Sequence, residues 1–138
     1  MSIAAFRILG GPNVEDLAQG QEAIRDGLAP ASVRHLAKCY DVSLEQMGRL
    51  SGIPKATLTR RLKARRPLAV PEADRVYRLA RIYSYAADVF DDEAKARDWF
   101  LEPNRALGGA KPFDLLDTQP GVERVERVLD RIEQGTFS

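Results

Sequence analysis

Apolar residues recur at helical spacing along most of the chain. Between positions 30 and 40, Val33, Leu36 and Tyr40 are three and four residues apart and therefore share one face of a helix. The longest such pattern spans 71–90 and begins at a proline, which suits a first helical turn. Strict alternation of apolar and polar residues, which predicts strands, is nearly absent. The pattern predicts an all-α protein.

Capping and turn residues divide the middle of the chain into two short helices. Ser43 followed by Gln46 resembles a capping box, in which each side chain accepts a hydrogen bond from the other residue's backbone. That helix is expected to stop near Gly52. Pro54 then begins a second helix, which Pro67 ends. Two short helices joined by a tight turn are typical of a helix–turn–helix motif.

Similar signals follow the long helix. Asp91 or Asp92 is expected to cap the next helix, and the glycine- and proline-containing stretch 102–112 is expected to be a loop. Thr118 precedes the last amphipathic helix, which Gly135 ends.

These elements predict three parts. Residues 1–29 form an N-terminal arm or helix, for which Asn13 is the candidate N-cap. Residues 30–70 form a helix–turn–helix DNA-binding domain. It packs against a small helical C-terminal domain, 71–138, that includes the long connecting helix.

Two glycines fit the predicted motif. Gly48 is a small residue where the second helix crosses the first closely. Gly52 lies in the turn, where a left-handed backbone is usual and glycine adopts it at little cost. The second helix of such a motif enters the major groove with its N-terminal residues near base edges.

Polar residues off the apolar stripe of that second helix are the candidate DNA contacts. Arginine and lysine suit guanine edges or phosphates, and threonine binds phosphate or contacts a thymine methyl group. Arg61 and Arg65 are expected to contact phosphates. The alternative is a helical hairpin with a solvated basic face. The candidates are Lys55, Thr57, Thr59, Arg60, Arg61, Lys63 and Arg65.

Charge is distributed unevenly, although the net charge is only +1. Residues 34–66 contain nine Lys or Arg and two acidic residues, a local charge of +7. Residues 84–138 contain seven Lys or Arg and twelve acidic residues, a local charge of −5. A polyanion is attracted to the first segment and repelled by the second. The asymmetry favours two different partners for the two segments.

Composition argues against several other classes. One histidine and one cysteine, with no phosphate-cradling glycine motif or metal-ligand cluster, argue against an enzyme, a bound metal or a cofactor. Cys39 falls in an apolar helical pattern and is expected to be buried. No apolar run approaches the roughly 18 residues of a membrane span, and no signal peptide is evident. A cytoplasmic location is expected.

The C-terminal third carries an ordered series of distinctive motifs. They are Trp99, Pro103-Asn104, Ala106-Leu107-Gly108-Gly109, Pro112-Phe113, Leu115-Leu116, Thr118, Gly121-Val122 and Glu133-Gln134-Gly135. In this order they resemble the toxin-binding segment of the Xre/MbcA/ParS antitoxin family. The upstream stretch 52–82 resembles the Xre-like helix–turn–helix half of the same family. Two departures, Phe90-Asp91 and Phe100, are tolerable changes of packing or turn.

The resemblance implies the antitoxin of a type II toxin–antitoxin pair. The usual partner in this family is a RES-domain toxin, which consumes NAD or uses it as a substrate. The antitoxin would occlude the toxin's active site and would also repress its own promoter. The candidate toxin contacts are Asn104, Gly108, Gly109, Arg127, Arg131, Glu133, Gly135 and Phe137.

Several alternatives stay open. Gly108 and Gly109 either allow close approach of a partner or only shape a turn. Tyr77, Tyr83 and Tyr85 either form part of a homodimer interface or cover the core. Two alternatives to an antitoxin are a stand-alone repressor whose C-terminal domain serves only dimerisation, and a protein–protein module that has lost DNA binding.

Overall fold

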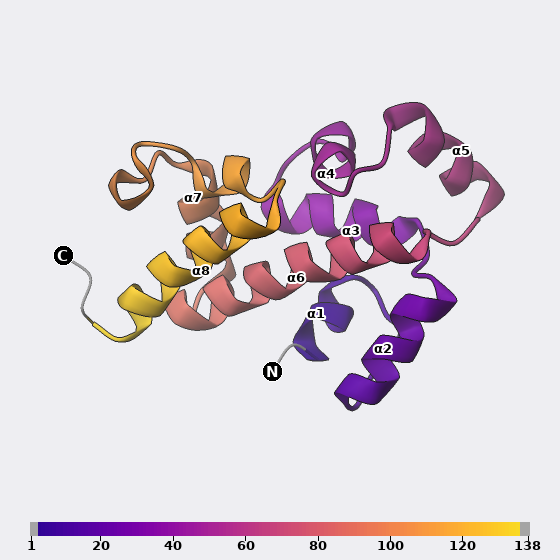
Figure 1. The fold of residues 1–138 in the computed structure, drawn as a ribbon, viewed down its shortest axis with the longest axis horizontal. Helices are drawn as coiled ribbons and strands as arrows, with labels where there is room; N and C mark the ends of the chain where they lie inside the picture. The colour runs from indigo at the N-terminus through magenta and orange to yellow at the C-terminus, as the bar shows by residue number, and fades with distance from the viewer. Residues whose placement is uncertain (1–2, 136–138) are drawn as a thin grey trace. The chain divides into compact units, whose positions relative to one another are not determined.

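The computed structural model describes residues 3–135 (Figure 1), and every regular element in that range is helical. The chain divides into two compact units, one ending at Arg81 and one beginning at Ile82. This confirms the prediction of an all-α protein. Within the same range no helix has both the length and the apolar character needed to cross a membrane.

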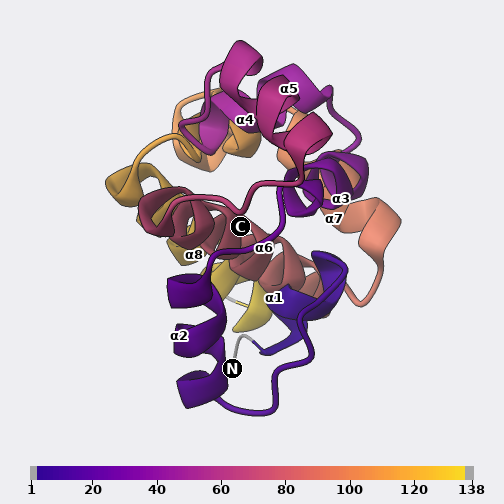
Figure 2. The same cartoon turned by 90° about the vertical axis from the view of Figure 1, so that its right-hand side faces the viewer.

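The first unit contains five helices and the beginning of a sixth. Figure 2 shows the same chain turned by 90° about the vertical axis. The elements are α1 (Ile3–Ile8), α2 (Leu17–Asp26), α3 (Ala31–Tyr40), α4 (Leu44–Leu50), α5 (Lys55–Ala64) and α6 (Val70–Phe90), the last of which continues into the second unit.

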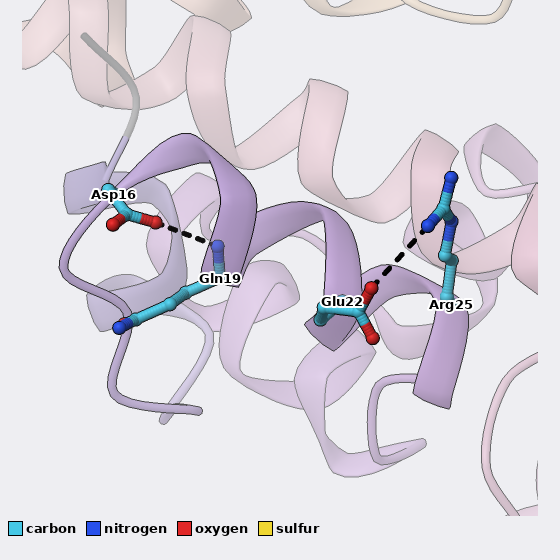
Figure 3. A network of polar contacts seen from close by, with 4 residues as sticks. All are labelled: Asp16, Gln19, Glu22 and Arg25. Carbon is cyan, nitrogen blue, oxygen red and sulfur yellow. Dashed lines mark hydrogen bonds and ion pairs between the residues drawn. The ribbon is translucent and has the colours of Figure 1, made fainter.

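Helix α2 begins later than predicted. Asp16, not Asn13, is its N-cap, because the Asp16 carboxylate accepts a 2.8 Å hydrogen bond from the backbone N–H of Gln19 (Figure 3). The Gln19 side chain in turn accepts from the backbone N–H of Glu15 at 2.8 Å. These two hydrogen bonds satisfy the backbone N–H groups of Glu15 and Gln19, and Asp16 directly precedes the first helical residue, Leu17, whereas Asn13 lies three residues earlier.

Helix α1 was not predicted, since the first residues were expected only to form an arm. Its Phe6 is 3% exposed, and the Phe6 ring lies 5.1 Å from the ring of Tyr77 on α6. Helix α1 also contacts α2 and α3. The helix is only six residues long, which is too short for local propensity alone to stabilise it, so packing accounts for it.

A buried hydrogen bond links α3 to α6, and α4, between them in the chain, begins at a complete capping box. Both halves of the predicted capping box at Ser43 and Gln46 are present. The Tyr40 hydroxyl donates a 2.8 Å hydrogen bond to the Leu79 carbonyl oxygen, and both residues are fully buried. The last helical residue of α3 is therefore attached to the middle of α6. Cys39, beside it, is half-buried rather than buried as predicted.

The second unit packs around the end of α6. It contains α7 (Glu93–Leu101), two 3₁₀ turns, η1 (Arg105–Leu107) and η2 (Pro112–Leu115), and α8 (Gln119–Glu133). Asp92 caps α7 and Thr118 caps α8. The core contains the rings of Tyr83 and Phe100, stacked with their centroids 6.3 Å apart, together with the buried face of α8. The expected helix starts are confirmed, and the expected loop 102–112 contains a short 3₁₀ turn.

Candidate functional site

The turn between α4 and α5 has the geometry predicted for a helix–turn–helix. Gly52 adopts φ +73°, and the next residue, Ile53, donates its backbone N–H to the Gly48 carbonyl at 2.9 Å. A Cβ atom on Gly48 would lie 3.2 Å from a Leu58 methyl group. Both glycines therefore have the roles expected of them, one in the turn and one where the helices cross. Helices α4 and α5 are adjacent in both views (Figure 1, Figure 2).

Helix α5 presents a polar face to solvent. Leu58 is 2% exposed and faces the core of the unit, whereas Lys55, Thr59, Arg60 and Lys63 are exposed. Thr57 is half-buried. Arg65, also exposed, follows the helix as its C-cap with φ +54°. Five of the seven candidate DNA contacts are thus exposed, and the other two, Thr57 and Arg61, are half-buried.

Lys55 has a nearby acidic neighbour, but the pair is weak. Its Nζ atom lies 3.6 Å from a carboxylate oxygen of Glu45, and the two side chains are 73% and 65% exposed. Ion pairs at such exposed sites contribute little, because water screens the attraction. Lys55 therefore keeps its positive charge available to an anion.

Arg61 differs from the other candidates. Its guanidinium binds the carboxylate of Glu72 on α6, and the two side chains are only 23% and 13% exposed. The same carboxylate oxygen accepts a 2.8 Å hydrogen bond from the backbone N–H of Ala69, just before α6. The guanidinium of Arg61 is thus paired with a carboxylate of its own unit.

In the second unit, Asn104 closes the loop that contains the two candidate glycines. Its side chain accepts a 2.9 Å hydrogen bond from the Ala106 N–H, and its own N–H donates to the Ala110 carbonyl at 3.0 Å. Its backbone carbonyl accepts from the N–H groups of Leu107 and Gly109, at 3.0 and 2.8 Å. Leu107 is 4% exposed and anchors the loop. The role of Asn104 in the described structure is to hold this loop in shape.

Gly108 and Gly109 form the exposed tip of the loop. Their φ angles are +67° and +88°, which favour glycine. Among the described residues, nothing lies within 4 Å of a Cβ atom built on either one. The turn therefore requires these glycines for backbone conformation, and their outer side is open to solvent.

Helix α8 buries one face and exposes the other. Val122, Val125 and Leu129 are fully buried, whereas the candidate contacts on the far face and at the helix end are exposed. Gly135 follows the helix with φ +71°. Phe137 lies outside the described residues. The exposed candidates are Arg127, Arg131, Glu133 and Gly135.

Tyr85 links α6 to the acidic end of α8. Its hydroxyl donates to a carboxylate oxygen of Asp130 at 2.5 Å, and a carboxylate oxygen of Glu133 lies 3.4 Å away. Burial of the phenol, helped by the hydrogen bond and the negative charge of Asp130, raises the pKa of Tyr85 well above its ordinary value. The carboxylate of Glu133, a candidate toxin contact, therefore already contacts Tyr85 of its own unit.

The three tyrosines of α6 contact other residues of their own units. Tyr83 is 1% exposed, Tyr77 contacts Phe6 and Tyr85 binds Asp130. The burial of Tyr83 contradicts its use in a dimer interface. These contacts support the alternative that the tyrosines cover the core.

A cavity of about 730 Å³ lies in the N-terminal part of the first unit. It is lined by residues 9–14, by α2 and by the beginning of α3, and His35 is at its edge. The His35 side chain is exposed. The cavity is lined by none of the fifteen candidate residues.

Comparison with known proteins gives two family matches, in the order of the two units. Residues 19–81 match the antitoxin Xre-like helix–turn–helix domain. Residues 86–135 match the antitoxin Xre/MbcA/ParS C-terminal toxin-binding domain.

Individual relatives carry related names. The chain is 39% identical over 83 residues to Antitoxin Xre of Pseudomonas putida, covering 60% of this chain and 52% of that protein. It is 36% identical over 91 residues to Antitoxin Xre of Yersinia enterocolitica, covering 65% and 62%. It is 27% identical over 124 residues to the Prs ADP-ribosylating antitoxin of a Sphingobium species, covering 83% and 78%. The chain thus spans about half the length of the Pseudomonas relative.

Proposed function

The chain belongs to the Xre/MbcA/ParS antitoxin family, and we propose that it is the antitoxin of a type II toxin–antitoxin pair. The observation that carries this proposal is the order of its two matched domains, a helix–turn–helix at 19–81 and a toxin-binding domain at 86–135. The first exposes a basic helix, and the second exposes a glycine loop and a charged helix face. We take the protein to be a non-enzymatic adaptor that needs no cofactor.

The DNA-binding half of the proposal rests on α5. Its cations other than Arg61 are exposed, as is Thr59, whereas Leu58 packs inward. In the major groove, Lys55 at the beginning of the helix and Thr59 and Arg60 near its middle would face base edges, and Lys63 and Arg65 would contact phosphates. Thr57, half-buried, would contribute through its hydroxyl. The target is the operator in the protein's own promoter, so that binding represses the operon.

The partner of the second unit is a RES-domain toxin that consumes NAD or uses it as a substrate. The resemblance of the C-terminal motifs supports this choice. The name of the Sphingobium relative couples an antitoxin with ADP-ribosylation. That chemistry ordinarily takes its ADP-ribose from NAD, so the name is compatible with an NAD-using toxin.

Neutralisation is proposed to occur by occlusion. The rigid loop closed by Asn104 offers a tip, Gly108-Gly109, that lacks side chains and permits close approach of a partner surface. The exposed face of α8 adds Arg127 and Arg131, and the chain end beyond Glu133 includes Gly135 and Phe137. An NAD site binds phosphates and sugars, and these charged groups and the tail would fill it.

Truncation tests the contribution of the tail. One variant ends before Ile132, and a matched variant ends after Gln134, which leaves α8 complete because the helix ends at Glu133. Occlusion by the tail predicts that both variants inhibit the toxin less than the full chain does. Full inhibition by the shorter variant would exclude a role for the tail and leave the loop as the contact.

The proposed DNA site also predicts the oligomeric state of the protein. Operators with two half-sites about 34 Å apart are usually bound by dimers. We propose a homodimer that forms a larger hetero-oligomer with the toxin. Light scattering of the chain alone and with toxin measures both masses, and a chain that stays monomeric on its operator would contradict the homodimer.

The second candidate function is a stand-alone repressor whose C-terminal domain serves only dimerisation. The exposed basic face of α5 favours it as much as it favours an antitoxin. Co-purification separates the two: an antitoxin retains the product of the neighbouring reading frame, and a stand-alone repressor does not.

A further inference from the structure

Arg61 and Glu72 form a contact that no DNA-binding role explains. Arg61 belongs to the last turn of α5 and Glu72 to the first turn of α6. The guanidinium and the carboxylate bind each other, with 23% and 13% of the two side chains exposed. This pair is much less accessible to water than the pair between Lys55 and Glu45, at 73% and 65%. Partial burial reduces screening, so the attraction between Arg61 and Glu72 is the stronger of the two.

Glu72 is itself held in place. Its Oε1 atom accepts from the Arg61 guanidinium and from the Ala69 N–H, at 2.8 Å for the latter. It lies at the N-terminal end of α6, where a negative charge is favourable. The carboxylate is therefore positioned by α6 whether or not DNA is present.

The neighbouring cations lack such a partner. Between residues 3 and 135, no salt bridge occupies Arg60, Lys63, Arg65 or Arg66, and all four side chains are exposed. A phosphate can approach any of them without displacing a carboxylate. At Arg61 it would have to displace Glu72.

We infer that Glu72 withholds Arg61 from the DNA backbone and thereby limits sequence-independent binding. This inference rests on the proposed DNA binding by α5. It assigns Glu72 as a positioning residue that fixes the end of the recognition helix against α6. It also removes Arg61 from the cations that neutralise phosphates. The number of phosphates contacted sets how steeply affinity falls with salt, so the inference has a direct readout.

The test measures the salt dependence of binding to a duplex of random sequence, using the full chain. In the Glu72→Gln variant the amide oxygen still accepts from Ala69, but the charge that holds Arg61 is gone. Arg61 then reaches a phosphate, and the slope of log K against log salt steepens by about 0.9. Between 50 and 200 mM salt this is an additional loss of affinity of about 3.5-fold relative to the wild type.

Two further variants make the test specific. The double variant Arg61→Gln with Glu72→Gln has the wild-type net charge and no Arg61, and its slope is expected to equal that of the wild type. Glu45→Gln also removes one acid beside α5, but its partner Lys55 is already exposed, so this slope is expected to stay unchanged. Circular dichroism on each variant checks folding.

Each other result overturns the inference. An unchanged slope for Glu72→Gln means that Arg61 stays where it is. A double variant whose slope is flatter by about 0.9 means that Arg61 already binds phosphate in the wild type. An equal steepening of the slope in Glu45→Gln means that the loss of any acidic charge beside α5 has this effect, and that the release of Arg61 is not its cause. If neither the wild type nor Glu72→Gln binds any duplex at low salt, the proposed DNA binding fails and the inference fails with it, whereas DNA binding with unchanged slopes overturns the inference alone.

Discussion

Gly121 lies so close to Leu115 that a Cβ atom at position 121 would be 1.8 Å from the Leu115 carbonyl oxygen. Gly121 is buried in the first turn of α8, and Leu115 ends the 3₁₀ turn η2. The backbone of one element therefore packs directly on the other. This contact sets the entry of the chain into the helix whose outer face is proposed to meet the toxin.

Gly121→Ala is expected to destabilise the protein by about 1–3 kcal/mol or more, because the obstacle is backbone and cannot rotate away. Denaturant unfolding measures the loss. Gln119→Ala is the matched control, since Gln119 belongs to the same turn and is exposed. The control is expected to stay within about 0.5 kcal/mol of the wild type. Equal stability of both variants would mean that η2 and α8 do not pack as described.

Gly52→Ala tests the turn of the helix–turn–helix. The backbone conformation at φ +73° costs a residue with a Cβ atom about 1–2 kcal/mol, and that atom would also lie 2.7 Å from the Arg75 guanidinium. Adding Arg75→Ala removes the contact but leaves the backbone cost, so it should restore only part of the stability lost. Gly52→Asn should lose less than Gly52→Ala, because asparagine tolerates this conformation better. Complete recovery in the Gly52→Ala, Arg75→Ala double variant would contradict the backbone explanation.

The raised pKa of Tyr85 predicts that the folded protein loses stability at alkaline pH. Its phenol is protonated in both the folded and the unfolded chain below the ordinary tyrosine pKa of about 10. Because the pKa of Tyr85 is raised in the folded protein, the unfolded chain ionises first as the pH increases. The contribution of Tyr85 is therefore complete below about pH 10 and decreases above it.

Unfolding of the wild type and of Tyr85→Phe across this range measures the effect. The difference in unfolding free energy between them should shrink above pH 10. Asp130→Asn removes one cause of the raised pKa and should move the ionisation of Tyr85, followed by tyrosinate absorbance, toward lower pH. A difference that stays constant from neutral to alkaline pH would argue against the link between Tyr85 and Asp130.

Arg60→Ala tests the proposed recognition face. If Arg60 binds a guanine edge, its loss should weaken operator binding by about 1–3 kcal/mol and relax sequence preference at that base pair. Arg25→Ala on α2 is the control. Arg25 is an exposed arginine, 60% accessible, that is not part of α5, and its loss should leave operator binding unchanged. Equal binding by both variants would remove Arg60 from the site.

Local signals in the sequence account for most of the fold. The capping box at Ser43 and Gln46 and the left-handed turn at Gly52 depend on residues a few positions apart, so both could be predicted. Local reasoning also assigned the α2 cap to Asn13, although Asp16 has the same chemistry three residues later.

Contacts between residues distant in the chain could not be predicted in this way. Arg61 meets Glu72 eleven positions later only because of the path that the chain follows between α5 and α6. From its position on the polar side of α5, Arg61 was expected to bind phosphate. For Tyr83 the sequence left a dimer interface and the core as open alternatives, and its stacking on Phe100 of α7 places it in the core. The proposed identity of the protein partner rests on the resemblance of the C-terminal motifs, because the physical features of α8 and the glycine loop are compatible with many partners.

The most direct test of the account is co-expression with the neighbouring reading frame, with growth and cellular NAD as the readouts. The neighbouring product alone is expected to arrest growth and to alter the NAD pool, and this chain is expected to reverse both effects. The chain ending before Ile132 should reverse them less well. A neighbouring product that is harmless, or an arrest that the full chain does not relieve, would contradict the proposal that this protein is an antitoxin.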